Sequence, residues 1–370
     1  MANIFSADLT LPSELISACL LSVAFAAMAG AFLVASSSLH ERWTHDPIDG
    51  TQKRHGTSVP RVGGAAIYCA LVAIYYLQEH GSDSAIALKF LIVAAGPAFA
   101  IGLAEDLSKR VSVVTRLFVT ASAGIFAIVS SGTVISSVGL GQTIDAILGI
   151  RPIAIVFTAI ALAGLSNAFN LIDGLNGLAA TKSILLYIAI AMIAFSNQDS
   201  SLAFVSLFLA SATAGFLLWN WPWGKLFLGD GGAYFLGFTV GWLAILLPQN
   251  NPAVSPWASL LILIYPITET LYSIWRRMRA NASPGEPDQW HLHTLVNDYL
   301  RSIGVFRSSS RLLVNSVAGM LCVALSIPPV IIAVVFYSNT ALLGAACVAH
   351  VVLYVASYRL LFNRLHSVSR

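Results

Sequence analysis

Polar residues that could take part in chemistry gather in one stretch of an otherwise apolar chain. The stretch is SNAFNLIDGLNGLAATK, residues 166–182, and it follows a long apolar run. Three amides and a carboxylate recur in it at every third position, at Asn167, Asn170, Asp173 and Asn176. Each such group costs several kcal/mol in hydrocarbon unless it finds a partner or water. Hydrogen bonding between helices explains one Asn better than four polar groups, so the pattern indicates a binding site at the end of a membrane helix.

Two further acidic motifs could hold a metal ion or remove a proton. Glu105 and Asp106 are adjacent in GLAEDLSKR, and such carboxylates repel unless a cation, a proton or water screens them. The alternative is an exposed loop in which Glu105 pairs with Lys109. Asp230 lies in FLGDGGAYFLG, where glycine N–H groups and a helix N-terminus suit phosphate and the carboxylate suits a bridging divalent ion. A plain helix cap is the alternative for Asp230.

Basic and aromatic residues complete the set of candidates. The first basic loop contains His55 and Arg61 and ends in VGG, although an ordinary basic loop at a lipid surface would look similar. Phe227 precedes the Asp230 motif and could stack on a base. His291 and His293 form an H-x-H pair that, with nearby arginines, favours anion binding over a zinc site.

One more carboxylate, Glu269, lies inside an apolar run near its predicted cytoplasmic end. Arg276 is its candidate partner, and a role in helix packing is the alternative.

The elements that position these residues are membrane helices. The chain has 370 residues, of which 57% are apolar and 10% charged, and its mean hydropathy is +0.79. Soluble domains carry roughly 25% charged residues. We therefore predict an all-α polytopic integral membrane protein with about eleven transmembrane helices, ten being the alternative count. The predicted spans are residues 11–37, 62–78, 85–104, 117–136, 152–170, 180–196, 201–219, 233–248, 256–275, 312–335 and 341–361.

The distribution of basic residues predicts the orientation. With a periplasmic N-terminus and a cytoplasmic C-terminus, all of the 20 Lys and Arg residues except Lys89 and Arg151 fall in cytoplasmic segments or at their helix ends. The chain reads as one transmembrane domain, residues 1–370, without internal repeats. Its candidate catalytic segments all lie on the cytoplasmic side, near residues 38–64, 105–116, 166–182, 219–232 and 276–311.

Five segments in this order resemble one family: PRVGG, GLAEDLSKR, NAFNLIDGLNGLAA, FLGDGGAYFLG and HLH. The family is that of the polyprenyl-phosphate N-acetylhexosamine-1-phosphate transferases, glycosyltransferase family 4, which includes phospho-MurNAc-pentapeptide transferase. The resemblance implies transfer of a sugar 1-phosphate from a UDP-sugar to undecaprenyl phosphate, with release of UMP. It further implies Mg²⁺ or Mn²⁺ as cofactor, a bacterial inner membrane location and the first membrane step of a cell-surface polysaccharide such as O-antigen.

The resemblance also implies residue roles. The metal falls to Asp230 and Asn170, and the nucleotide to Asp173, Asn176 and Phe227. The phosphates fall to His55, Arg61, His291 and His293. Catalysis falls to Asp106, Glu105 and Asp230, with proton removal from the acceptor phosphate as the first mechanism and a covalent carboxylate–phosphate intermediate as the alternative. The chain departs from the family at Glu105, where Asp is usual, and at Asn176, where many members have Asp.

The main competing function is a membrane transporter or lipid flippase, which would place polar groups at mid-membrane on several helices. Here the polar groups collect at one face, which favours an enzyme. The expected partners are the lipid acceptor, the UDP-sugar and the membrane. No nucleic acid is expected, and a homodimer is left open.

Overall fold

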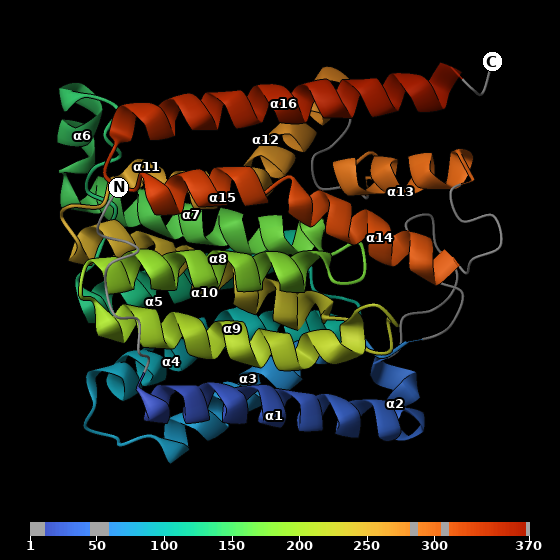
Figure 1. Ribbon diagram of the computed structural model, residues 1–370, viewed down its shortest axis with the longest axis horizontal. Helices are drawn as coiled ribbons and strands as arrows, with labels where there is room; N and C mark the ends of the chain where they lie inside the picture. Colours follow the sequence, from blue (N-terminus) through green and yellow to red (C-terminus); the bar gives the residue numbers. More distant parts are fainter. Residues whose placement is uncertain (1–11, 45–58, 282–287, 305–310, 368–370) are drawn as a thin grey trace.

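The computed structural model describes residues 12–44, 59–281, 288–304 and 311–367, and every regular element among them is an α-helix (Figure 1). Most of these helices are long and apolar: α1 (Ser13–Ala35), α4 (Asp83–Ser108), α5 (Val113–Ser131), α7 (Arg151–Ile172), α8 (Leu178–Ser196), α9 (Ser200–Asn220), α10 (Gly229–Asn250) and α16 (Thr340–Ser367). The others are shorter or joined in pairs: α2 (Ser37–Thr44), α3 (Gly63–Leu77), α6 (Gln142–Leu148), α11 (Pro256–Ile262), α12 (Ile264–Arg279), α13 (Leu292–Ser302), α14 (Arg311–Ala324) and α15 (Ile327–Val335).

The predicted spans coincide with these helices. In the described part of the chain, nine helices are long and apolar enough to cross a membrane, counting α14 and α15 together, and ten if the bent pair α11–α12 is one span. The eleventh predicted span corresponds to α3, whose 15 residues reach only about 22 Å against a hydrocarbon core of about 30 Å. The all-α membrane class is confirmed, while the number of spans and the side of each terminus stay predictions.

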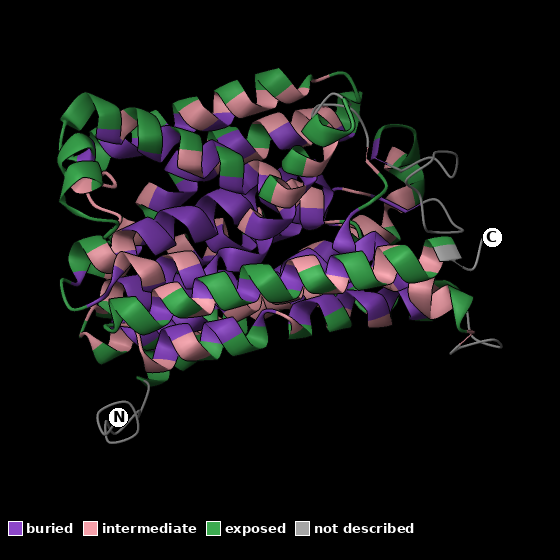
Figure 2. Ribbon diagram, turned by 90° about the horizontal axis from the view of Figure 1, so that it is seen from above, coloured by how far each residue is buried: buried purple, intermediate pink, exposed green. Residues whose placement is uncertain are grey.

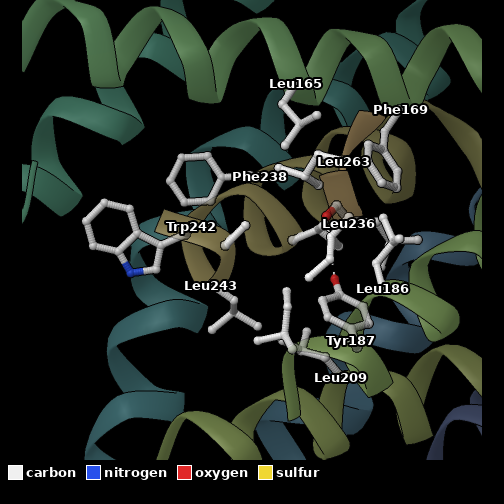
Figure 3. Packing of buried hydrophobic residues seen from close by; sticks show 14 of the residues in the cluster. Leu165, Phe169, Leu186, Tyr187, Leu209, Leu236, Phe238, Trp242, Leu243 and Leu263 are labelled. Carbon is white, nitrogen blue, oxygen red and sulfur yellow. Dashed lines mark hydrogen bonds between the residues drawn. The ribbon is translucent and has the colours of Figure 1, made fainter. Parts of the chain in front are cut away.

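Helix α10 forms the centre of the bundle. Every residue from Gly229 to Ile245 is buried, and the helix packs against α3, α4, α7, α8 and α11. Its glycines allow close packing on α7, since a Cβ at Gly237 would lie 2.6 Å from Cα of Ser166. Large apolar side chains of α7, α8 and α10 fill the space between these helices (Figure 3). The hydroxyl of Tyr187 lies 2.6 Å from that of Thr239.

The outer helices present apolar side chains outward. Phe32 of α1 and Phe118 of α5 are about three-quarters exposed, at 71% and 72%. Figure 2 shows the same contrast, with buried residues in the interior of the bundle and exposed ones on its outer helices. Such surfaces are expected where lipid replaces water as the solvent.

The bent pair α11–α12 changes direction by 70° at Leu263. Pro266 explains the break, because it has no N–H to donate to the carbonyl of Ile262 and its ring would clash with that carbonyl. Helices α2 and α13 lie at one end of the bundle, and the short helix α6 lies at the other (Figure 1).

Candidate active site

The N-terminus of α10 is held by a carboxylate from α4. Asp106 is fully buried, and its Oδ1 and Oδ2 accept hydrogen bonds from the N–H groups of Asp230 and Gly231, both at 2.9 Å. These N–H groups have no partner within their own helix, and the helix dipole favours a negative charge at this end. Asp106 therefore fixes where α10 begins and, with it, where Asp230 lies.

Two arginines connect the carboxylates. Nε of Arg61 donates to Oδ1 of Asp106 at 3.1 Å, and its Nη2 donates to Oδ1 of Asp230 at 2.9 Å. Nη1 of Arg116, from the first turn of α5, donates to Oδ2 of Asp230. We call these four residues the arginine cluster. It joins α4, α5, α10 and the segment before α3, and its two carboxylates are matched by two guanidinium groups.

Glycines let these backbones approach each other. The N–H of Gly64 donates to the carbonyl of Leu228 at 2.9 Å. A Cβ at Gly64 would lie 2.3 Å from Cα of Gly232, and one at Gly102 would lie 2.5 Å from the carbonyl oxygen of Asp230. These contacts are with backbone atoms, which cannot rotate away as a side chain can. The VGG and GDGG segments thus fold together because neither carries side chains at the contact.

Asp173 is electrostatically coupled to the arginine cluster. It follows the last residue of α7, and its N–H donates to the carbonyl of Asn170 at 3.3 Å. The pKa of Asp173 is raised to about 7, chiefly by burial and then by the charge of Asp230, with a smaller contribution from Asp106, while Arg61 lowers it. The end of α7 therefore brings a third carboxylate into the field of the other two.

The H-x-H pair reaches the same end of α7. The rings of His291 and His293 are stacked, with centroids 5.4 Å apart and planes 9° apart. A Cβ at Gly174 would lie 2.3 Å from Nε2 of His293, so the imidazole rests directly against this glycine. The fold thus places two imidazoles from the start of α13 beside the residue that follows Asp173.

A buried carboxylate forms a hydrogen bond with the first histidine of this pair. Glu269 of α12 is fully buried, and its Oε1 accepts from Nδ1 of His291 at 3.2 Å. We call Glu269, His291 and His293 the imidazole cluster. The expected partnership of Glu269 with Arg276 is wrong, because Arg276 instead pairs with Asp288. Glu269, in the bent pair α11–α12, and its histidine partner at the start of α13 are brought together only by the fold. Spacing in the sequence therefore pointed to the nearest arginine instead.

Other predicted site residues are placed differently. The structure leaves Asn170 half-buried on the last turn of α7 and Phe227 half-buried, with its backbone N–H on the carbonyl of Pro60 at 2.9 Å. Oε2 of Glu105 accepts from the N–H of Val111 at 2.7 Å, within the turn between α4 and α5.

Asn176 is turned toward α14. Its N–H donates to Oδ1 of Asn315 at 2.8 Å, and its side-chain amide lies 3.4 Å from the hydroxyl of Ser316. These hydrogen bonds fix a turn between α7 and α8, and none of the contacts found for this side chain in the described residues is with the arginine cluster. His55 lies outside the described residues.

Arg116 was not among the predicted site residues. Besides pairing with Asp230, its guanidinium lies 5.6 Å from the ring centre of Tyr234, whose hydroxyl donates to Oδ1 of Asn167 at 3.1 Å. The available signal was its position at the cytoplasmic start of a span, one loop after Asp106. A basic loop contains several such residues, and only the fold shows which one reaches the carboxylate.

The donor atoms fit a divalent ion that shares its ligands with a substrate. Mg²⁺ takes oxygen ligands, usually one or two carboxylates completed by phosphate oxygens and water. The oxygens of Asp230 and Asn170 are of this kind, and the crowding of Asp230 with two other carboxylates favours a cation. Among the described residues no group of three or more His, Cys, Asp or Glu could enclose an ion alone. An ion at Asp230 would replace a guanidinium contact of Arg61 or Arg116.

Comparisons with known proteins identify the family of this chain. The model of the family "Glycosyl transferase family 4" matches residues 88–248, which run from α4 to α10. The chain is 29% identical over 251 residues to undecaprenyl-phosphate alpha-N-acetylglucosaminyl 1-phosphate transferase of Escherichia coli K12, covering 66% of this chain and 67% of that protein.

Two further relatives have closely similar names. The Yersinia pestis protein of the same name is 27% identical over 295 residues, covering 78% of this chain and 77% of the relative. The Bacillus subtilis "probable undecaprenyl-phosphate N-acetylglucosaminyl 1-phosphate transferase" is 31% identical over 246 residues, covering 65% of this chain and 66% of the relative. The family match, these relatives and the five ordered motifs agree, and the chain belongs to glycosyl transferase family 4, the polyprenyl-phosphate hexosamine-1-phosphate transferases.

Proposed function

We propose that this protein transfers an N-acetylhexosamine 1-phosphate from a UDP-sugar to undecaprenyl phosphate. The observation that carries the proposal is the meeting of three segments at one end of the bundle: the arginine cluster, the end of α7 and the imidazole cluster. The arrangement brings guanidinium and imidazole groups, both of which can bind phosphate, to the end of α7. The relatives' names supply the acceptor lipid and the type of group transferred.

The proposed reaction is a direct displacement at phosphorus. An oxygen of the lipid phosphate forms a bond to the sugar-bearing phosphorus of the donor, and the bond from that phosphorus to the bridging oxygen breaks. UMP leaves with the bridging oxygen, and the lipid keeps the sugar as a diphosphate. Phosphoryl transfer needs positioning and charge neutralisation more than covalent assistance, and this chain provides fixed cations for both.

Asp106 serves this reaction by position. Both of its oxygens accept backbone N–H groups of α10, so the carboxylate orients Asp230 and Arg61. The acceptor phosphate has a second pKa of about 6 and is mostly ionised at neutral pH. The displacement therefore proceeds without removal of a proton by Asp106 or Glu105, and a covalent carboxylate–phosphate intermediate is unnecessary.

Asp230 and Asn170 would hold Mg²⁺, with Mn²⁺ as a substitute. The ion, when bound, neutralises negative charge on the donor diphosphate. Arg61 and Arg116 would bind phosphate oxygens, and the imidazole cluster would bind the diphosphate beside Gly174. Asp173 and the half-buried Phe227 are the proposed contacts for the nucleotide.

The proposed setting is the bacterial inner membrane, with the site facing the cytoplasm, where UDP-sugars are made. The relatives are bacterial, and the basic residues gather at the segments that carry the site. The product would be the first lipid-linked intermediate of a cell-surface polysaccharide, O-antigen or a related glycan. Membership of a transferase family argues against the alternative of a transporter or lipid flippase.

The test is a panel of UDP-N-acetyl sugars offered to the purified protein with undecaprenyl phosphate and Mg²⁺. We expect UMP release and a lipid-linked sugar with at least one donor, and neither product when the lipid or the divalent ion is omitted. Absence of UMP and of lipid product with every donor would overturn the proposal. Activity that survives thorough removal of divalent ions would overturn the metal requirement alone.

A further inference from the structure

Glu269 is a carboxylate buried in a helix that is long and apolar enough to lie in the membrane. It has 0% exposure in the second half of the bent pair α11–α12. Burying a carboxylate costs several kcal/mol unless it is paired and hydrogen-bonded. A carboxylate at this position is therefore expected to have a specific role, and the contacts of Glu269 indicate that role.

The hydrogen bonds of its Oε1 reach the start of α13. Oε1 of Glu269 lies 3.2 Å from Nδ1 of His291 and accepts the N–H of Leu292 at 3.3 Å. Because a carboxylate only accepts hydrogen bonds, Nδ1 of His291 carries a proton in this contact. The hydroxyl of Ser273, one turn along α12, lies 3.2 Å from the same nitrogen. Helix α12 thus determines the orientation of the His291 ring.

The second nitrogen of the ring faces another carboxylate. Nε2 of His291 lies 3.8 Å from Oδ2 of Asp288, which also pairs with Arg276. The other oxygen of Asp288, Oδ1, accepts the N–H of Trp290. His291 is therefore placed between Glu269 and Asp288. Both ring nitrogens thus face carboxylate oxygens, which limits rotation of the ring.

The orientation of the His291 ring affects that of His293. Its ring is stacked on that of His293 with nearly parallel planes, 9° apart. His293, which is 3% exposed, has its Nε2 against Gly174, the residue after Asp173. A rotation of His291 would remove the surface on which His293 lies, and His293 is the ring that reaches the end of α7.

We propose that Glu269 is a positioning residue for the transfer reaction: it holds His291, and through the stacked pair it sets His293 for the diphosphate of the nucleotide-sugar donor. This inference rests on the proposed function. Glu269 does not touch the substrate and acts only through His291. Its removal should weaken use of the donor, while use of the lipid acceptor stays close to that of the unmodified protein.

The test is a double-mutant cycle on the full-length protein with Glu269→Gln and His291→Ala. Glu269→Gln keeps the size of the side chain and removes its charge. We expect each single variant to lower kcat/KM for the donor by about 10- to 100-fold, the range found for groups that orient a ligand. The double variant should fall little further than His291→Ala, because groups that act as a unit are non-additive. KM for the lipid acceptor should change by less than about twofold.

Thr268→Val is the matched control, since Thr268 is the buried neighbour of Glu269 on α12 and its hydroxyl has no hydrogen-bond partner among the described residues. It should keep donor kcat/KM close to that of the unmodified protein. Fully additive losses, or equal losses for donor and acceptor, would assign Glu269 a structural role and overturn the positioning proposal. A loss as large in Thr268→Val would do the same. An unmodified protein that makes no lipid product overturns the proposed function itself, which separates the two failures.

Discussion

The arginine cluster and the imidazole cluster both act on the end of α7, and they are built differently. In the arginine cluster, carboxylates pair with guanidinium groups, and Asp106 is held by backbone N–H groups at 2.9 Å. In the imidazole cluster, one carboxylate pairs with a histidine at 3.2 Å, and a second ring is held by stacking. Guanidinium stays charged at any ordinary pH, whereas imidazole changes its charge near neutrality.

The difference extends to the surroundings of each cluster. Backbones of α3, α4 and α10 touch through glycines around Asp230, so this side has little room to move. The histidines instead lie at the start of α13, and His293 meets α7 through a side-chain atom. We infer that the arginine cluster is the rigid side of the site and the imidazole cluster the adjustable one. The predictions below test this division.

The largest effect is expected from Asp230→Asn. The substitution keeps the shape but removes the carboxylate that pairs with Arg116, leaves Arg61 paired with Asp106, and removes the proposed metal ligand. We expect kcat to fall by about 10³-fold or more, in line with the loss of a preorganised electrostatic group. UMP release measures this, with the thermal unfolding midpoint as the control for folding. Activity within about tenfold of the unmodified protein would mean that the arginine cluster is not the centre of the reaction.

Gly64→Ala tests the rigidity of the arginine cluster. The new Cβ would lie 2.3 Å from both Cα and N of Gly232, and neither backbone atom can rotate away. We expect a loss of about 1–3 kcal/mol in stability, as for overpacked interiors, together with a strong loss of activity. Gly81→Ala is the matched control, because nothing lies within 4 Å of its Cβ. Equal unfolding midpoints for the two variants would contradict the rigid packing.

Gly174→Ala makes the same chemical change on the imidazole side. Here the Cβ would lie 2.3 Å from Nε2 of His293, a side chain that can turn. We expect a smaller loss of stability than for Gly64→Ala, and a rise of about tenfold in KM for the donor, since misplacing a binding group weakens ligand use. Donor titrations and unfolding curves measured side by side check this. A larger loss of stability in Gly174→Ala than in Gly64→Ala would contradict the division into a rigid and an adjustable side.

Sequence patterns carried much of this architecture because membrane helices leave a strong apolar signal. All eleven predicted spans coincide with helices, and the order of motifs identified the family. The partners of the charged groups were harder to predict. Arg116 and Asp230 are 114 positions apart, and Glu269 meets His291 because the start of α13 returns to α12, which follows the bend at Leu263. Such pairings depend on helix packing, which single-sequence periodicity does not encode.

A smaller effect is expected from Asp173→Asn, which tests the coupling between the two sides. The pKa of Asp173 is raised to about 7, so the folded protein keeps a proton that the unfolded chain, with a pKa of about 3.9, releases. Stability attributable to this group therefore falls as pH rises from about 4 to about 7 and then levels off. Asparagine cannot ionise, so the variant should lose this part of the slope.

Unfolding midpoints across the pH range measure that slope. Asp145→Asn is the control, because the N–H of Val138, the hydroxyl of Ser137 and the N–H of Gly139 lower the pKa of Asp145 at the opposite end of the bundle. That variant should keep the decline between about pH 4 and 7. An unchanged slope in Asp173→Asn would show that the pKa of Asp173 is not raised in the folded protein.

The smallest effect is expected from Glu105→Gln. Glu105 accepts one hydrogen bond, from the N–H of Val111 at 2.7 Å, and the amide oxygen of glutamine can accept the same bond. We expect kcat within about threefold of the unmodified protein, as for a substitution that leaves no buried group unpaired. Asp106→Asn is the contrast, since both oxygens of Asp106 accept N–H groups of α10 and either orientation of an amide turns its NH₂ against one of them. If Glu105→Gln instead lost activity as Asp106→Asn does, Glu105 would take a direct part in the reaction, and the rigid side of the site would extend into the turn between α4 and α5.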